Sequence, residues 1–315
     1  MICLPLFRCL VALAFGAFAL ACSEGEGRAA AGSANASPFD AERAFSHLER
    51  QVAFGPRVPG TEGHRRQLEW MQSFLAERAD TVLLQPFRHV AESGDTLRLT
   101  NVFARFRPDA RDRILLIAHW DTRPRADQSP RRADRDLPVP GANDGASGTA
   151  VLLEIAEVLR QHRPPMGVDL LFVDGEDFGP GERDMYLGAK HFARNLPPGY
   201  QPLYGVLLDM VGDRDLRFPV EGYSARYAPE VVRRVWDLAR EMGYGHVFVN
   251  EAGPYISDDH IPLNEAGIRT IDIIDFDYGP GHRYWHTPED VPANTSAESL
   301  GIVGRVMTEL IRRGG

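Results

Sequence analysis

The fold of this chain is decided around one stretch, Pro140-Gly141-Ala142-Asn143-Asp144-Gly145-Ala146-Ser147-Gly148. It contains a single carboxylate, Asp144, among glycine, alanine and serine residues. It follows a polar loop rich in Arg, Asp and Pro (122–142) and begins an apolar helical run, 151–159. A metal ion can approach a carboxylate closely where neighbouring residues have almost no side chain. We therefore expect Asp144 at the centre of a metal site.

Apolar runs on both sides of this stretch are typical of strands buried on both faces of a sheet. They cover residues 113–118, 168–173, 204–208 and 268–274. Two alternating runs, 81–90 and 96–107, predict an antiparallel hairpin. Amphipathic periodicity predicts helices at 37–52, with Ser37 as the cap, and at 61–79, 145–161, 228–243 and 296–313. With no internal repeat and no second composition boundary, residues 37–315 are predicted to form one α/β domain.

Composition and charge narrow the classes of protein to consider. The chain has 315 residues, enough for one large α/β domain or two small ones. Its formal net charge is −9, which gives no electrostatic support for a nucleic-acid partner. We therefore expect no nucleic acid among its ligands.

The first 21 residues differ from the rest. Arg8 is their only charged residue, and the apolar run 10–21 is too short to span a bilayer but suits a signal peptide. The run ends in Ala19-Leu20-Ala21-Cys22, which resembles a bacterial lipobox. We expect residues 1–21 to be removed, Cys22 to carry a lipid anchor at the periplasmic face of the cell envelope, and residues 22–36 to be a flexible tether. The alternative is a plain signal peptide cleaved nearby. The mature chain keeps one cysteine and hence no disulfide.

Acids and histidines recur where the apolar strands end. Open α/β sheets place their ligands in a crevice at the carboxyl ends of the strands. Imidazole and carboxylate without thiolate suit catalytic zinc or a related divalent ion. Each of these residues alone could instead cap a strand end, but together they predict one site, built from His119, Asp121, Glu176, Asp177, Asp209 and His286.

The side chains of the adjacent pair Glu176-Asp177 need not point to the same site. Neighbouring side chains of an extended segment point to opposite sides. Both can reach one site only where the loop bends, and their roles can then differ. One carboxylate can bind metal while the other acts as a general base. Two acids in sequence also occur on solvated loops, so the pair by itself is weak support.

Seven segments together resemble the zinc-dependent exopeptidase superfamily, which contains di-zinc aminopeptidases and glutaminyl-peptide cyclotransferases. The resemblance spans roughly residues 37–313 and implies a mixed, twisted sheet with helices on both faces. The segments that carry it are Gly55-Pro56-Arg57-Val58-Pro59-Gly60, Ala118-His119-Trp120-Asp121-Thr122-Arg123-Pro124, Gly141-Ala142-Asn143-Asp144-Gly145-Ala146-Ser147-Gly148, Asp174-Gly175-Glu176-Asp177, Leu208-Asp209-Met210-Val211-Gly212, Ser257-Asp258-Asp259-His260-Ile261-Pro262 and Trp285-His286-Thr287.

The superfamily divides by chemistry, and the resemblance implies different ligand sets for each branch. In its cyclotransferases one zinc ion suffices, which would fall on Asp144, Asp177 and His286, with Glu176 moving the proton. In its aminopeptidases two zinc ions share Asp144, and Glu176 is the general base. The other positions of that two-zinc set fall on His119, Asp177, Asp209 and His286.

Details of sequence favour the cyclotransferase branch. The run 258–262, Trp285 before His286, Glu-Asp at 176–177 and the run 118–124 look like bacterial cyclotransferases of the animal type. The run 143–148 is also close to the aminopeptidase form, so a di-zinc aminopeptidase remains the alternative. A catalytically silent zinc-binding lipoprotein is a third reading. It is disfavoured because Glu176 and the ligand positions are all present.

The resemblance implies a peptide or protein with N-terminal Gln as substrate, converted to pyroglutamate with release of ammonia. Asp209 and Asp259 would orient Glu176 or the substrate nitrogens. In the one-zinc form, His119 and Asp121 would support the site from behind the ligands. An apolar pocket for the Gln side chain would have aromatic walls, unless these residues only pack a loop: Phe276, Tyr278, Tyr284 and Trp285.

Overall fold

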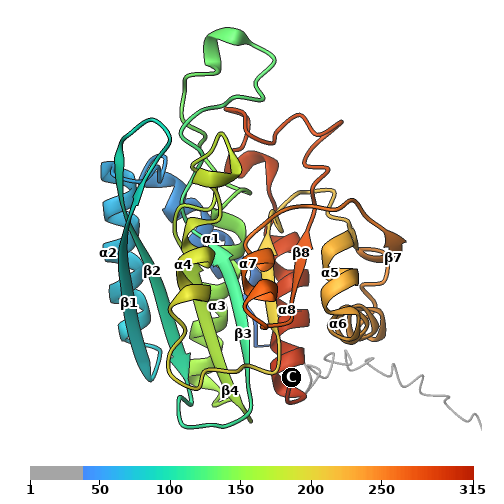
Figure 1. Cartoon of the computed structure of the whole chain (residues 1–315). Coiled ribbons are helices and arrows are strands. Elements are labelled where there is room, and N and C mark those ends of the chain that lie inside the picture. Colours follow the sequence, from blue (N-terminus) through green and yellow to red (C-terminus); the bar gives the residue numbers. More distant parts are fainter. Residues whose placement is uncertain (1–37) are drawn as a thin grey trace, which may run out of the picture. The chain divides into compact units, whose positions relative to one another are not determined.

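A six-stranded mixed sheet runs through residues 38–315, the part of the chain that the computed structural model describes (Figure 1). The strands are β1 (Thr81–Val90), β2 (Thr96–Phe106), β3 (Arg113–His119), β4 (Gly167–Val173), β5 (Gly205–Asp209) and β8 (Thr270–Ile274). Their order across the sheet is β1-β2-β4-β3-β5-β8. The pairs β1–β2 and β2–β4 are antiparallel, whereas β4, β3, β5 and β8 are mutually parallel. The hairpin and the four buried strands predicted from the sequence are confirmed.

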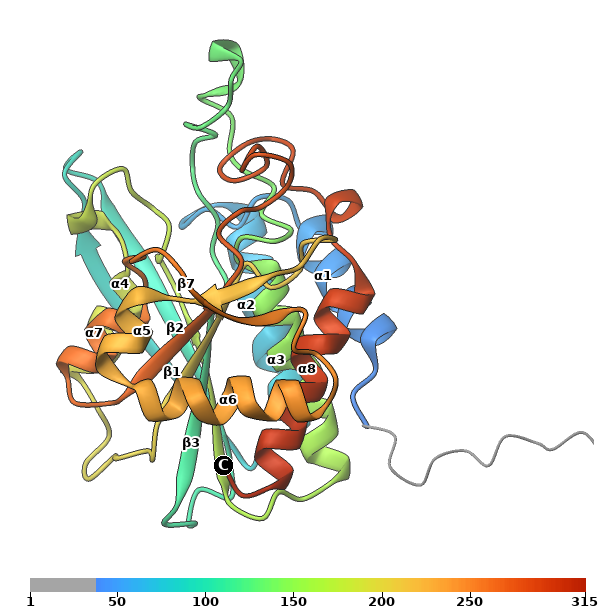
Figure 2. The ribbon, with the colours of Figure 1, turned by 90° about the vertical axis from the view of Figure 1, so that its right-hand side faces the viewer.

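Helices cover both faces of this sheet, as Figure 2 shows nearly edge-on. One face packs against α1 (Ala41–Ala53), α2 (Glu62–Ala76), α3 (Ala146–Gln161), α6 (Pro229–Glu241) and α8 (Ala297–Arg312). The other packs against α4 (Leu187–Arg194) and α7 (His260–Glu265). Successive residues of β3 alternate between the two cores, Leu116 in the first and Leu115 in the second. The strand is therefore apolar throughout, as expected for one covered on both faces.

The helix that follows the Asp144 stretch lies against the centre of the sheet. All residues of α3 from Ala146 to Leu159 are buried. A Cβ atom on Gly148 would collide with the carbonyl oxygen of Leu208 in β5, so this position has room only for glycine. The close packing places the first turn of α3, and Asp144 just before it, beside the carboxyl end of β5.

The structure corrects the first helix cap and adds elements that the sequence did not predict. Helix α1 begins at Ala41 and is capped by Asp40, whose carboxylate accepts the amide of Arg43 at 3.0 Å. The predicted cap, Ser37, lies outside the described residues. Besides α4 and α7, the additions are α5 (Gly222–Tyr227), a parallel pair of short strands, β6 (Phe218–Val220) and β7 (Phe248–Ala252), and 3-10 turns at Arg132–Asp134, Glu182–Asp184 and Pro292–Asn294.

The predicted signal peptide, tether and Cys22 anchor lie outside the described residues. Within 38–315, no helix has both the length and the apolarity that crossing a membrane requires.

Candidate functional site

The predicted site residues meet at one edge of the sheet. Because β4, β3, β5 and β8 are parallel neighbours, their carboxyl ends point the same way. His119 ends β3 and Asp209 ends β5. Glu176 follows β4, and His286 lies in the loop after β8. Side chains separated by up to 167 positions (His119 to His286) are thereby brought to a single place.

Three of these residues form a compact group of possible metal ligands, Asp144, Asp177 and His286. The Nε2 atom of His286 lies 3.3 Å from Oδ2 of Asp177 and 3.4 Å from Oδ2 of Asp144. All three side chains are buried, and Oδ2 of Asp177 has no hydrogen-bond partner. A buried, unpartnered carboxylate oxygen is costly unless a cation faces it. Two carboxylates and one imidazole match the donors of a catalytic zinc site, with a fourth position left for water or substrate.

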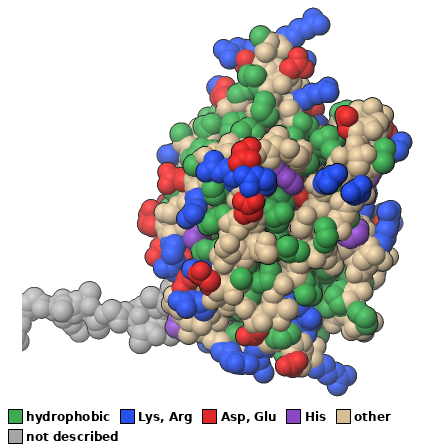
Figure 3. Space-filling model, turned by 90° about the vertical axis from the view of Figure 1, so that its left-hand side faces the viewer, with side chains coloured by type: hydrophobic (Ala, Val, Ile, Leu, Met, Phe, Trp, Pro, Cys, Tyr) green, Lys and Arg blue, Asp and Glu red, His purple; other side chains and the backbone are tan. Residues whose placement is uncertain are grey.

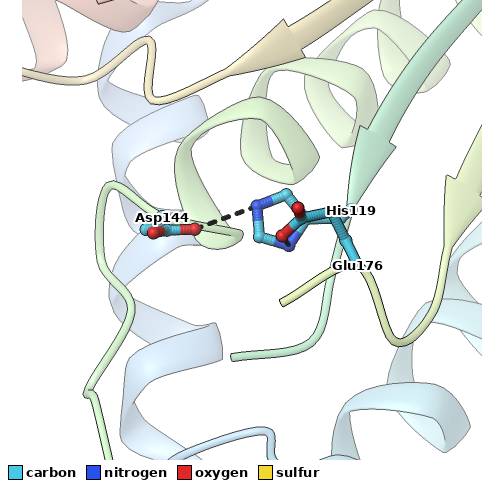
Figure 4. Close-up of side chains that lie close together, drawn as sticks. All are labelled: His119, Asp144 and Glu176. Carbon is cyan, nitrogen blue, oxygen red and sulfur yellow. Dashed lines mark ion pairs between the residues drawn. The ribbon is translucent and has the colours of Figure 1, made fainter. Parts of the chain in front are cut away.

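His119, Asp144 and Glu176 form a second group of possible ligands, which shares Asp144 with the first. Figure 4 shows these three side chains. The Nε2 atom of His119 is 3.1 Å from Oδ1 of Asp144 and 3.1 Å from Oδ1 of Asp209. Its Nδ1 atom faces Oδ1 of Asp121 at 3.6 Å and Oε2 of Glu176 at 3.7 Å. The imidazole therefore connects the candidate ligand Asp144 with the candidate base Glu176.

Asp121 explains how two adjacent acids reach one site. Its carboxylate accepts the backbone amide of Glu176 at 3.0 Å and that of Asp177 at 3.3 Å. These bonds bend the chain after β4, so Glu176 turns toward His119 and Asp177 toward His286. Asp121 itself is completely buried and supports the ligand loop from behind.

The Asp144 stretch is fixed by groups that are distant in sequence. Asp290 accepts the amides of Asn143 at 2.7 Å and Asp144 at 3.2 Å. The buried guanidinium of Arg57 donates to the carbonyl of Pro140 at 2.5 Å. Gly145 has φ of +98°, and a Cβ atom there would collide with the carbonyl oxygen of Asp121 and crowd the ring of His119. Only glycine allows Asp144 to lie so close to the histidine.

The two key carboxyl groups have opposite electrostatic surroundings. Burial raises the pKa of Glu176 well above its ordinary value, and Asp177 and Asp258 raise it further, against the opposing effect of His119. Burial also acts to raise the pKa of Asp144, but hydrogen bonds with His119 and His286 outweigh it and hold that pKa below its usual range. Asp144 is thus suited to remain a charged ligand, and Glu176 to hold and release a proton.

Asp258 belongs to the segment 257–262 that carries the resemblance, but a role was predicted only for its neighbour Asp259. Both are buried, with carboxylate oxygens that lack hydrogen-bond partners, and both raise the pKa of Glu176. Burial raises the pKa of Asp259 itself to about 8. Tyr186 joins the two loops: its amide donates to the carbonyl of Glu176 at 2.8 Å and its hydroxyl to that of Ser257 at 2.7 Å.

The predicted aromatic wall divides into two parts. Trp285 stacks on the ring of His286 with centroids 3.7 Å apart, and Phe276 meets Trp285 edge-on at 5.2 Å. Beside Phe276 lies a cavity of about 600 Å³ that is lined by Ile256 and Ile274 and also by charged side chains, among them Arg217 and Asp275. Its lining does not include Asp144, Asp177 or His286. Tyr278 is fully buried, so it offers no surface to a substrate.

The hydroxyl of Tyr278 donates instead to Asp290 at 2.9 Å, which places this residue in support of the Asp144 stretch. Tyr284 packs edge-on against Tyr278 with centroids 5.3 Å apart. Of the four predicted aromatic residues, Trp285 and Phe276 are therefore the ones placed next to the ligands and the cavity.

Two further residues contact the ligands and were given no role from the sequence, although Arg123 stands in the quoted segment 118–124. Arg123 donates to Oδ1 of Asp177 at 2.6 Å, and Asp127 lies 3.5 Å from Nδ1 of His286. Their Arg-to-Asp spacing of four positions in the 122–142 loop was the available signal.

Comparison with known proteins gives consistent results. Residues 101–311 match the sequence model of peptidase family M28. The structure of Bacteroides thetaiotaomicron glutaminyl cyclase bound to N-acetylhistamine is 38% identical, covers 89% of this chain and 100% of its own, and superposes with a TM-score of 0.86. Tannerella forsythia glutaminyl cyclase is 39% identical over 88% of this chain and 99% of its own, with a TM-score of 0.84. A leucine aminopeptidase precursor from Bacteroides thetaiotaomicron is 37% identical over 89% and 99%, with a TM-score of 0.86.

Proposed function

The chain belongs to peptidase family M28, and we propose that within this family it is a zinc-dependent glutaminyl-peptide cyclotransferase. It would convert the N-terminal Gln of peptides or proteins to pyroglutamate and release ammonia. Similarity to bacterial glutaminyl cyclases over nearly the whole described chain supports the proposal. So does a buried site in which the ligand group Asp144, Asp177 and His286 lies beside an acid with a raised pKa, Glu176.

One observation carries the choice of a single zinc ion. Nε2 of His119, the ring nitrogen that faces Asp144, already has a protein partner, Oδ1 of Asp209 at 3.1 Å. Oδ2 of Asp177, by contrast, has no hydrogen-bond partner and faces Nε2 of His286 at 3.3 Å. We therefore expect the zinc ion to bind to Asp144, Asp177 and His286. We expect about one zinc per chain in metal analysis.

The mechanism follows from the position of Glu176. A zinc ion held by the three ligands would polarise the γ-amide carbonyl of the substrate as a Lewis acid. The substrate's own α-amine attacks the γ-carbon, and the bond from that carbon to the amide nitrogen breaks. Glu176 accepts the proton that the amine loses and returns it to the departing nitrogen, which leaves as ammonia. The reactants are already tethered, so holding them in the attacking geometry lowers the barrier substantially.

Surrounding acids prepare Glu176 for this exchange. Asp209, Asp258 and Asp259 lie in the same buried region, and Asp258 and Asp259, where they are ionised, favour the protonated form of Glu176. We assign Asp209 and Asp259 to orienting the substrate nitrogens. Trp285 and Phe276 would pack against the Gln side chain.

A di-zinc aminopeptidase is the second candidate, favoured by one feature of the geometry. His119, Asp144 and Asp209 approach each other at 3.1 Å through Nε2 of His119, and could provide a second set of ligands. The similarity to a leucine aminopeptidase precursor agrees with this reading. Glu176 would then take a proton from a water molecule that attacks the first peptide bond.

One experiment separates the two candidates. Purified protein is given Gln-initiated and Leu-initiated dipeptides in parallel, and ammonia and free amino acids are measured. The cyclotransferase releases ammonia from the Gln substrate and leaves the peptide bond intact; release of free Leu would refute it.

Glu176→Gln is expected to abolish turnover while zinc content stays at the parent level, because Gln cannot carry the proton. Turnover near the parent level in this variant would overturn the assigned role of Glu176.

Export and a lipid anchor on Cys22 stay predictions from the sequence, and we propose both for the mature protein. Mass spectrometry of protein from membranes would show a lipidated Cys22 at the N-terminus; an unmodified N-terminus elsewhere would contradict the anchor.

A further inference from the structure

We propose that Arg123 and Asp127 form a clamp that positions two of the zinc ligands, Asp177 and His286, before the metal binds. The inference rests on the zinc site of the proposed function and adds two residues to it. Both come from the loop after β3, whereas the ligands that they contact follow β4 and β8. One loop thus sets the separation between ligands from two other strand ends.

The contacts form a closed ring. The Nη1 atom of Arg123 donates to Oδ1 of Asp177 at 2.6 Å. Its Nε and Nη2 atoms donate to the two carboxylate oxygens of Asp127 at 3.0 and 2.7 Å. Oδ1 of Asp127 faces Nδ1 of His286 at 3.5 Å, and Nε2 of the same ring faces Oδ2 of Asp177 at 3.3 Å. A backbone bond from the amide of Gln128 to the carbonyl of His286, at 3.3 Å, holds the same loop in place.

The ring leaves one metal-binding atom free on each ligand. Arg123 occupies Oδ1 of Asp177, and Oδ2 is the buried oxygen without a partner. Asp177 is therefore set to bind through one oxygen. Nδ1 of His286 is buried and makes no hydrogen bond; Oδ1 of Asp127 faces it at 3.5 Å. A carboxylate in that position favours a proton on Nδ1 and leaves the Nε2 lone pair for the metal. Carboxylates that orient a metal-binding histidine in this way are a general feature of zinc sites.

The position of Arg123 requires a guanidinium. The side chain is buried, and a Cβ atom on Gly179 would lie only 2.7 Å from its Nη1 atom. The planar fork donates to two carboxylates at once, in a geometry that the single ammonium of lysine cannot reproduce. The same loop then leaves the site and projects from the molecule, where basic side chains gather (Figures 1 and 3).

Two other roles for Arg123 make different predictions. If its positive charge only weakened the attraction of the site for a cation, removing that charge would tighten zinc binding. If the ion pair only stabilised the fold, its loss would lower the stability of the metal-free protein and leave zinc affinity unchanged. Positioning predicts weaker zinc binding in a protein that remains folded.

The test measures the zinc dissociation constant of the full chain by competition with a chromophoric chelator, together with urea unfolding of the metal-free protein. For Arg123→Met we expect zinc affinity to fall by roughly 10- to 100-fold, the usual cost of losing a residue that orients a ligand. Arg123→Lys keeps the charge but not the fork, and should recover little of the loss. Asp127→Asn, which changes few atoms, should weaken binding in the same direction.

Arg131→Met is the matched control. Arg131 lies in the same loop and makes an ion pair of the same kind with Asp134, at 2.6 and 2.9 Å, but is exposed and contacts no ligand. The zinc affinity of Arg131→Met should therefore equal that of the parent protein.

Parent-like or tighter zinc binding by Arg123→Met would overturn the clamp. If that variant fails to fold, parent-like affinity of both Arg123→Lys and Asp127→Asn would overturn it equally. Because the readout is zinc affinity, failure to release ammonia from a Gln substrate would refute the proposed function and leave the clamp standing.

Discussion

Asp121→Asn tests whether the bend after β4 controls catalysis. The Asp121 carboxylate holds the amides of Glu176 and Asp177 with two bonds and faces Nδ1 of His119. Asn keeps the shape but presents one oxygen and one NH2 group. One of the two amides therefore loses its acceptor and meets a donor instead.

The loss of one acceptor sets the expected change in stability and in activity. A hydrogen bond to a charged group is worth about 1.5–3 kcal/mol, so we expect about 2 kcal/mol of lost stability. The freed segment also lets Glu176 and Asp177 move, and orientation of this kind is worth roughly 10- to 100-fold in activity. That loss corresponds to about 1.4–2.7 kcal/mol in the barrier for kcat/KM.

The assay combines urea unfolding with kcat/KM for ammonia release from a Gln-initiated dipeptide. Asp174→Asn is the matched control, because Asp174 is equally buried and also accepts a backbone amide, that of Thr100 at 2.6 Å, but pairs with His64 and not with a site residue. It should lose comparable stability and keep kcat/KM within about threefold, since it contacts no reacting group. Full activity of folded Asp121→Asn would refute the idea that this carboxylate positions Glu176.

Two further predictions concern stability. Burial, with Arg43 and Arg78, lowers the pKa of His47 from 6.5 to about 4. The uncharged His47 therefore contributes fully to the free energy of unfolding above pH 6.5, and this contribution is lost as pH falls through 4. The loss is about 3 kcal/mol, and urea unfolding of His47→Leu should show a correspondingly smaller fall between pH 7 and 4 than the parent; identical pH dependence would contradict this. Gly145→Ala should lower the free energy of unfolding by at least about 1–3 kcal/mol, because alanine is strained at φ +98°. It should also weaken zinc binding by displacing His119. Parent-like urea unfolding and zinc titration would contradict the steric argument.

The strands could be predicted from the sequence because a strand that is buried on both faces consists almost entirely of apolar residues. Every residue of β3 and β4 is buried, and continuous apolar runs encode that condition. The elements that were missed carry weaker signals. Helix α4 is only 8 residues long and begins after Tyr186 in a left-handed conformation, while α5 and α7 have 6 residues each. Such short segments have too few turns to show a period of 3.6 residues.

The site could be predicted from the sequence only as far as its residues lie at strand ends. The strand-end argument brought His119, Asp177, Asp209 and His286 to one edge of the sheet. The ligand set Asp144, Asp177 and His286 came from the family resemblance. The sequence could not assign a role to Arg123 or Asp127, since arginine and aspartate in a charged loop are usually exposed to solvent. Their role depends on a bend of the loop back toward the ligands, and that bend depends on contacts distant in sequence.

The same pattern of strand-end carboxylates cannot by itself assign a ligand and a proton carrier, and the structure shows what separates them. Asp144 lies between two imidazoles, which favour its charged form despite burial. Glu176 has burial and the negative charge of Asp177, Asp258 and Asp259 acting against its charged form. Chemically similar groups in one site thus acquire opposite protonation preferences from their neighbours. Cyclisation requires this division, because one acid must keep its charge to hold a cation while another gives up and recovers a proton. Replacing the partners of either acid should therefore disturb the reaction even where both carboxylates remain.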